Sequence, residues 1–237
     1  MSDGKGKTAA ELMAQLQADP EFRRREAEPD LKRAEREAAL KAEDRHICAA
    51  LAEMGITVDS VYDLVNTRTL HADAVPVLVE WLPKAKNDRM KEGIARALSF
   101  QGAGEEAVHV LLAEFESNDL DSLHMQSAKW AIGNAICEVA SPSMLEDLCR
   151  LVLDERHGSA RQMLAIAVGK TGKVAKDQAL KVLLQLLEDP MVQGHALSGL
   201  GHLRHEASRS AIQPFLDHQK AWIREEARKA LAGLKEM

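Results

Sequence analysis

The feature that most constrains this fold is a short apolar pattern that returns every 31 to 36 residues. Apolar side chains occupy the first, fifth, ninth and twelfth places of a stretch that begins at Val192, and the same pattern begins again at Ile223. Side chains at these places share one face of an α-helix. A pattern with this period is typical of stacked helical repeats, in which each unit buries its neighbour's apolar face. Its copies are anchored at Leu98, Ile132, Val168, Leu200 and Leu231.

Another apolar-periodic stretch precedes each copy, so the predicted repeat unit is a hairpin of two helices. Glycine, proline, aspartate and asparagine gather between the stretches, as expected at helix ends. Pro214 lies inside the last stretch and has no amide hydrogen, so we predict a bend there. The five preceding stretches are 73–82, 105–115, 141–153, 176–187 and 206–216.

Composition favours an all-α protein, because aromatic residues make up only 3% of a chain that is 46% hydrophobic and rich in good helix formers. A formal charge of −6 argues against a nucleic-acid partner. The three cysteines have unrelated spacings and predict neither a disulfide framework nor a zinc site. The first residues lack the apolar stretch of a secretory leader peptide, and no run of about eighteen apolar residues occurs that could span a membrane. We therefore expect a monomeric cytoplasmic protein without a membrane partner.

One copy of the pattern is close to a known motif. Residues 221–234 read Ala-Trp-Ile-Arg-Glu-Glu-Ala-Arg-Lys-Ala-Leu-Ala-Gly-Leu. This resembles the second helix of HEAT repeats, in particular the short variety named after phycobiliprotein lyases. The resemblance covers about residues 73–237 and implies five HEAT-like hairpins in a right-handed α-α superhelix. The copy around Ile132 departs most from the family's pattern, because Met125 stands where a basic residue is expected.

The first 72 residues follow a different rule. Residues 1–29 are expected to be flexible or partly helical, with a capping box at Thr8. Acidic and basic residues alternate through 21–45 and favour an exposed helix after Pro29. An apolar stripe follows and ends at Gly55, a predicted helix C-cap. We interpret residues 30–72 as an N-terminal helical cap that covers the first repeat.

A basic residue recurs one place after the first residue of the pattern, at Lys91, Arg161 and Arg224. Asp154 and Asp217 lie seven residues before the two arginines. The resemblance implies that such residues form a ladder, bridging neighbouring repeats through carboxylates and backbone carbonyls. The alternative is that they contact a ligand.

Residues on the opposite face of each second helix are expected to line the concave surface of the superhelix. Trp130 and Ile166 are large apolar side chains at such positions in adjacent repeats, flanked by polar groups, as at the centre of a protein interface. The alternative for both is packing between repeats. The predicted partner-binding residues are Arg96, Phe100, Gln126, Trp130, Asn134, Gln162, Ile166, Lys170, Ser198 and His202.

The sequence gives less support to metal binding or catalysis. His195, His202 and His205 form the densest histidine group, but helix spacing does not place all three together as metal ligands. No nucleophile elbow, phosphate loop or dinucleotide fingerprint occurs. We therefore predict a non-enzymatic scaffold or adaptor without a cofactor, binding a protein or peptide, a class that includes inhibitors and immunity proteins. The alternative implied by the resemblance is a lyase or chaperone for a bilin-like or metal cofactor.

Overall fold

The computed structural model of the chain describes residue 13 and residues 20–66, 72–117 and 123–234. Every secondary-structure element within these ranges is an α-helix or a 3-10 helix, which confirms the all-α fold class. No helix in these ranges is both long enough and apolar enough to cross a membrane. The chain divides into two compact units, Met1–Glu43 and Asp44–Met237.

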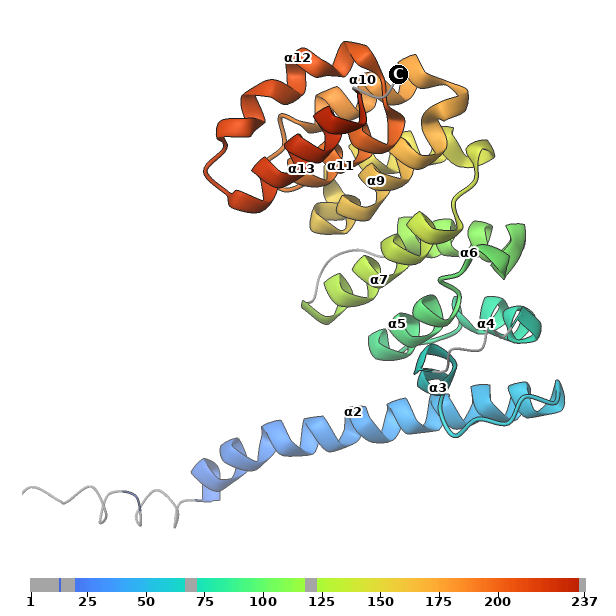
Figure 1. Cartoon of the computed structure of the whole chain (residues 1–237). Coiled ribbons are helices and arrows are strands. Elements are labelled where there is room, and N and C mark those ends of the chain that lie inside the picture. Colours follow the sequence, from blue (N-terminus) through green and yellow to red (C-terminus); the bar gives the residue numbers. More distant parts are fainter. Residues whose placement is uncertain (1–12, 14–19, 67–71, 118–122, 235–237) are drawn as a thin grey trace, which may run out of the picture. The chain divides into compact units, whose positions relative to one another are not determined.

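Helix α2 spans Pro20–Glu53 (Figure 1). The prediction that the helix starts after Pro29 is wrong, because α2 runs through this proline. Opposite charges four residues apart occur on both sides of Pro29, and they favour a helix despite the lost amide hydrogen bond. The capping box predicted at Thr8 lies outside the described residues.

The end of α2 matches the predicted cap at Gly55. Gly55 has φ = 82°, a left-handed conformation that favours glycine. Its amide donates to the carbonyl oxygen of Ala52, and the amide of Ile56 donates to that of Leu51, both over 2.9 Å. These two bonds form a Schellman motif. Ile47 and Leu51, in the last turns of the helix, are fully buried.

Helix α3 (Val61–Asn66) joins this segment to the helical pairs that follow. Asp44 of α2 accepts a hydrogen bond from the amide of Val61 over 2.8 Å. Tyr62 donates its hydroxyl hydrogen to the carbonyl oxygen of Arg89 over 2.6 Å, and α3 packs on the helix that carries Arg89. The second unit therefore begins with a short helical segment docked on the first pair.

Five pairs of helices follow in the described part of the second unit, each introduced by a three-residue 3-10 turn (Figure 1). The turns are η1 (Ala72–Ala74), η2 (Gln101–Ala103), η3 (Pro142–Met144), η5 (Gly172–Val174) and η6 (Glu206–Ser208). The first helices are α4 (Val75–Trp81), α6 (Gly104–Ser117), α8 (Leu145–Leu153), α10 (Lys176–Leu186) and α12 (Arg209–Ile212). The second helices are α5 (Asp88–Ala97), α7 (Leu123–Val139), α9 (Arg161–Thr171), α11 (Gln193–Leu203) and α13 (Ala221–Gly233).

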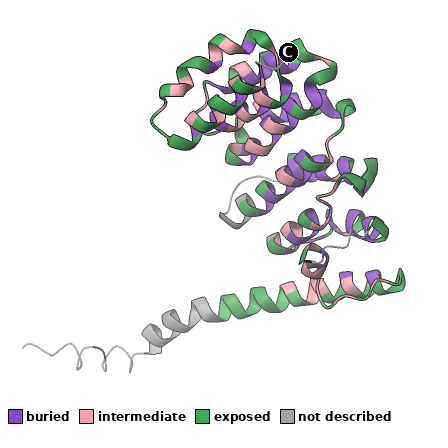
Figure 2. Cartoon of the chain, viewed as in Figure 1, coloured by how far each residue is buried: buried purple, intermediate pink, exposed green. Residues whose placement is uncertain are grey.

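The second helices stack on one another in chain order: α5 packs on α7, α7 on α9, α9 on α11, and α11 on α13. Leu98, Ile132, Val168 and Leu200 are fully buried, whereas Leu231 in the last pair is half-buried. Figure 2 shows buried residues along the faces that the packed helices share. The repeated apolar pattern therefore marks the core of the second unit.

Pro214 changes the geometry of the first helix of the fifth pair, as predicted. Helix α12 ends at Ile212, and the 3-10 turn η7 (Gln213–Asp217) continues the chain with Pro214 in its first turn. The proline ring and its missing amide hydrogen disfavour a continued α-helix here.

Candidate functional site

Buried polar contacts join successive helical pairs. Lys91 of α5 forms an ion pair with Glu114 of α6, and both side chains are largely buried. Arg161 of α9 donates to Oδ2 of Asp189 over 2.6 Å and to two backbone carbonyl oxygens of its own pair. In both cases the cation belongs to one pair and the carboxylate to the next. This is the bridging role that the family resemblance implied for these basic residues.

The carboxylate seven residues before Arg161 has a different role. Asp154 accepts three hydrogen bonds from the side chain of Arg156, two of them from Nε, and one from its backbone amide, which caps the 3-10 turn η4 (Glu155–Ala160). The adjacent Arg156 guanidinium lowers the pKa of Asp154 to about 2. The ladder instead uses Asp189, which lies one pair further along the chain.

The fourth and fifth pairs complete this pattern. Gln193 stands at the ladder position of α11, and its Nε2 lies 3.4 Å from Nε2 of His218 in the fifth pair. Arg224, at the same position of α13, donates to the carbonyl oxygens of His218 and Gln219 over 2.7 and 2.9 Å. Gln193 was not assigned to the ladder from the sequence, because only basic residues were considered at this position. Since an amide side chain also bridges two pairs, a polar residue rather than a charged one marks a ladder position.

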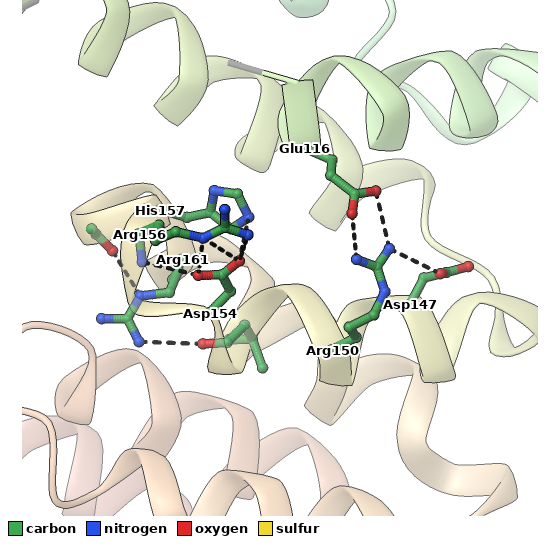
Figure 3. Close-up of polar contacts among 9 residues, drawn as sticks. Glu116, Asp147, Arg150, Asp154, Arg156, His157 and Arg161 are labelled. Carbon is green, nitrogen blue, oxygen red and sulfur yellow. Dashed lines mark hydrogen bonds and ion pairs between the residues drawn. The ribbon is translucent and has the colours of Figure 1, made fainter. Parts of the chain in front are cut away.

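The second pair has Met125 at the ladder position, and a different set of contacts holds it to the third pair. Arg150 of α8 donates to both carboxylate oxygens of Glu116 in α6, over 2.5 and 3.1 Å (Figure 3). This ion pair lowers the pKa of Glu116. Lys170 of α9 reaches back to the carbonyl oxygen of Cys137 and the carboxylate of Glu138 in α7.

Beneath these exposed pairs lies a buried group at the same junction. Lys129 of α7 is 1% exposed, and its Nζ is 5.2 Å from the centre of the Phe115 ring. His157 of η4 is 4% exposed, and its imidazole meets the same ring edge-on at 4.9 Å. Nε2 of His157 finds no hydrogen-bond partner among the described residues. Sequence reasoning had assigned no role to either residue.

Trp130 and Ile166 occupy equivalent positions, two residues before the anchors of α7 and α9. Trp130 is 37% exposed, and Ile166 is half-buried. Because α7 packs on α9, the two side chains lie on neighbouring helices of one surface. We call this the second-helix surface and define it by the described helical residues among those predicted: Arg96, Trp130, Asn134, Gln162, Ile166, Lys170, Ser198 and His202.

The polar members of this surface make contacts of their own. Nε2 of Gln162 donates to the carbonyl oxygen of Met191 in the next pair over 2.9 Å. Arg96 is held by Glu92 over 2.8 Å on its own helix. Burial, followed by the charges of Lys170 and Lys173, lowers the pKa of His202. Asn134 and Ser198 are half-buried.

Two further predicted residues do not join the surface in the same way. Helix α5 ends at Ala97, so Phe100 lies beyond it, in extended conformation before η2, where its ring covers Gly102. The helical spacing used for the prediction does not extend to Phe100. The side chain of Gln126 lies outside the described part of the structure.

Two exposed apolar residues that sequence reasoning did not assign to the surface extend it at one edge. Met191 is 49% exposed and Trp222 is 47% exposed. Both lie nine residues before an anchor, Trp222 in the first turn of α13 and Met191 two residues before α11 begins. The Trp222 ring lies over Gly194 and meets the His195 ring at 5.7 Å. Extending the predicted set of surface positions by one turn toward the N-terminus of each second helix would have included both residues.

The three histidines of the metal hypothesis make separate contacts. His195 packs on Trp222, and its pKa is lowered by burial. His202 lies in the last turn of α11. His205 lies 3.2 Å from the carboxylate of Asp177 and accepts a hydrogen bond from the amide of Ala207. Within the described ranges, no three His, Cys, Asp or Glu side chains are arranged to hold a metal ion.

Comparisons with known proteins add no functional information. No protein-family model matches the sequence, and no curated protein matches it. Three solved structures of engineered proteins are similar. The first is 19% identical, with a TM-score of 0.48, over 75% of this chain and 53% of its own length. The second is 22% identical, with a TM-score of 0.46, over 75% and 91%. The third is 18% identical, with a TM-score of 0.43, over 74% and 88%.

Proposed function

We propose that this chain is a non-enzymatic scaffold of the HEAT-repeat type, which binds a protein or a peptide on the second-helix surface. The recurring hairpins and the polar ladder of Lys91, Arg161 and Gln193 support the HEAT-like assignment. In a right-handed superhelix of such hairpins, the second-helix surface is concave, and it offers a partner an extended area without a rigid pocket.

The observation that carries the proposal is the exposure of Trp130. Its neighbours Ile132 and Ile136 on α7 are fully buried, whereas the larger indole is 37% exposed. Indole rings are prominent among the side chains that dominate binding energies, especially when apolar groups surround them and polar groups form a rim. Ile166 supplies the apolar neighbour, and Asn134, Gln162 and Lys170 supply the rim.

The test compares the double variant Trp130→Ala/Ile166→Asp with the wild-type chain in affinity capture from the native host, with partners identified by mass spectrometry. The purified partner is then titrated against both chains. We expect the double variant to lose binding while its circular dichroism and melting temperature stay unchanged. Val174→Asp is the matched control, because Val174 is 67% exposed on η5, outside this surface.

Two results would contradict the proposal. If the double variant unfolds, Trp130 and Ile166 belong to the core. If it binds the partner with unchanged affinity, the partner does not use this surface. The alternative function, a lyase or chaperone for a bilin-like or metal cofactor, predicts that the purified protein absorbs visible light or carries stoichiometric metal. Absorption spectroscopy and elemental analysis of the same preparation distinguish the two functions.

A further inference from the structure

The junction between the second and third helical pairs buries a cation where the other junctions bury apolar groups. Lys129 lies three residues before its anchor Ile132, and the equivalent residues of α5, α9 and α11 are Ala95, Ala165 and Leu197, all fully buried. A buried ammonium group is costly unless its surroundings compensate the charge. The Phe115 ring face provides part of this compensation through a cation–π contact.

His157 occupies the other side of the same ring. The imidazole is buried, meets Phe115 edge-on, and leaves Nε2 without a hydrogen-bond partner among the described residues. A carboxylate oxygen of Asp154 lies 3.7 Å from this nitrogen, beyond hydrogen-bond distance. The junction therefore buries an imidazole whose Nε2 makes no hydrogen bond within the described ranges, in an aromatic environment and next to a buried cation.

Charged groups act on His157 from its own turn and from helices α6 and α7. Asp154 favours the protonated imidazole, but this carboxylate already accepts four hydrogen bonds from Arg156 (Figure 3). Glu116 is engaged by Arg150 in the same way. The charged groups that act on His157 are Glu116 of α6, Lys129 of α7, and Asp154 and Arg156 beside or within η4. On the other two helices packed against this turn, Arg161 of α9 donates to the carbonyl oxygen of Gly158, and Arg150 of α8 is paired with Glu116 and Asp147.

We propose that this junction is a pH-sensitive joint, closed while His157 is neutral and loosened when His157 binds a proton. Protonation places a second positive charge beside the Phe115 ring that already holds Lys129, in a site that water does not reach. Moving η4 away from α7 separates the two cations and hydrates the imidazolium. Gly158, at the centre of η4, has φ = 52° and interrupts the helical geometry of this turn, so the segment is not held as part of a continuous helix.

The direction of the pH effect follows from the same environment. Burial, followed by the charge of Lys129, keeps the pKa of His157 below its ordinary value of 6.5. In the opened joint, the imidazole is hydrated and returns toward that value. The opened form therefore binds protons first, and the closed form loses stability as the pH falls from 6.5 toward the lower pKa of the closed form. Below that pKa the effect levels off.

The joint also regulates the second-helix surface, an extension that rests on the proposed function. Trp130 follows Lys129 directly on α7, and Ile166 lies on α9, across the junction. Loosening α7 from α9 separates the two apolar side chains, so partner binding should weaken on acidification. The pH dependence of the joint itself, in contrast, can be tested on the free chain without any partner.

The first experiment measures hydrogen exchange of the full chain at pH 7.5 and 5.5, corrected for the intrinsic pH dependence. We expect faster exchange in α7, η4 and the start of α9, with the opening constant rising by up to about tenfold per pH unit between the two pKa values. His157→Phe and His157→Gln should each abolish this increase. His109→Gln, at an exposed position of α6, is the matched control and should retain it.

The second experiment follows the His157 ring by NMR titration. We expect a pKa below 6.5 in the wild-type chain and a higher value in Lys129→Met, because this variant removes the neighbouring cation. Acrylamide quenching of Trp81→Phe/Trp222→Phe, in which Trp130 is the remaining tryptophan, should increase on acidification over the same pH range.

The proposal is overturned if exchange at the junction does not change with pH, if the increase persists in both His157 variants, or if Lys129→Met leaves the His157 titration where it was. Each of these results is compatible with a binding surface at Trp130 and Ile166. Conversely, unchanged binding by Trp130→Ala/Ile166→Asp would remove the proposed surface and leave the exchange results valid. The two failures are therefore distinguishable.

Discussion

Gly169 of α9 faces the backbone of Gly199 in α11, so closely that a Cβ atom on Gly169 would lie 2.1 Å from the Gly199 carbonyl oxygen. A Cβ atom on Gly199 would in turn lie 2.5 Å from the carbonyl oxygen of Ala165. The two helices therefore meet backbone to backbone. Rotation of a side chain cannot relieve either contact, because the opposing atoms belong to the main chain.

Gly199→Ala should consequently destabilise the protein by about 3 kcal/mol, at the upper end of the usual cost of overpacking, because α9 and α11 must move apart. Urea denaturation of the purified chain measures this loss. Gly233→Ala near the end of α13 is the control, since its Cβ would make only ordinary contacts at 3.6 Å or more, and alanine favours a helix. Equal stability of the two variants would show that α9 and α11 are further apart than described.

The helical pairs could be predicted because the core of a repeat protein leaves a regular trace in the sequence. Leu98, Ile132, Val168 and Leu200 are buried as the period required. The start of α2 could not be predicted in the same way, since the segment around Pro29 has no apolar periodicity. Alternating charges favour a helix there but do not determine where it begins.

The candidate site was predicted in part, for a related physical reason. Helical spacing determines which face of its helix a side chain occupies, so Trp130 and Gln162 could be assigned to one surface. Spacing does not determine what lies opposite. The partner of Arg161 could not be assigned from one helix, because Asp189 belongs to the next pair. Lys129 was missed although a comparison of the repeats carries the signal: a lysine stands where α5, α9 and α11 have a buried alanine or leucine.

Arg161 and Arg156 allow the effect of burial on an ion pair to be measured. Each donates to an aspartate over 2.6 Å, but the Arg161 side chain is buried, whereas that of Arg156 is largely exposed. We expect Arg161→Met to cost about 3 kcal/mol, because it leaves Asp189 and a buried carbonyl group without their donor. Arg156→Met should cost less than about 1 kcal/mol.

Thermal and urea denaturation of both variants, under identical conditions, test this contrast. Raising the salt concentration should weaken the contribution of Arg156 more than that of Arg161, since exposed pairs are screened by mobile ions. Similar losses in the two variants would mean that the ladder contributes no more to stability than a surface ion pair does.

Cys48 should be a poorly reactive thiol. Burial and the neighbouring Asp44 carboxylate raise its pKa from 9.0 to about 11, and Sγ lies 3.7 Å from the Asp44 carboxylate. At pH 8 the side chain therefore carries about a hundredfold less thiolate than an ordinary cysteine, and the thiolate is the reactive form. We expect correspondingly slow modification by a thiol reagent, with the reacted cysteine assigned by mass spectrometry.

Asp44→Asn is the informative variant for this prediction. The amide oxygen of asparagine can still accept the hydrogen bond from the amide of Val61, but the negative charge is gone. Modification of Cys48 should become faster yet remain below the rate of a free cysteine, because burial is the larger cause of the raised pKa. A wild-type Cys48 that reacts as fast as a free thiol would contradict the described environment.

Gly194→Ala should move Trp222 without unfolding the last two pairs. A Cβ atom on Gly194 would lie 1.9 Å from the Trp222 ring, but this ring ends a flexible, half-exposed side chain that can swing outward. The loss of stability should therefore stay below about 1 kcal/mol, unlike that of Gly199→Ala.

The same substitution should also change the titration of His195. His195 would lose its aromatic cover, and since burial is what lowers its pKa, the pKa should rise toward 6.5. Wild-type stability should fall as the pH drops from 6.5 toward the lower native pKa of His195, and the variant should lose less in this window. Tryptophan emission and NMR titration of His195 measure the two effects, and a shifted emission with an unchanged pKa would show that Trp222 does not bury the imidazole.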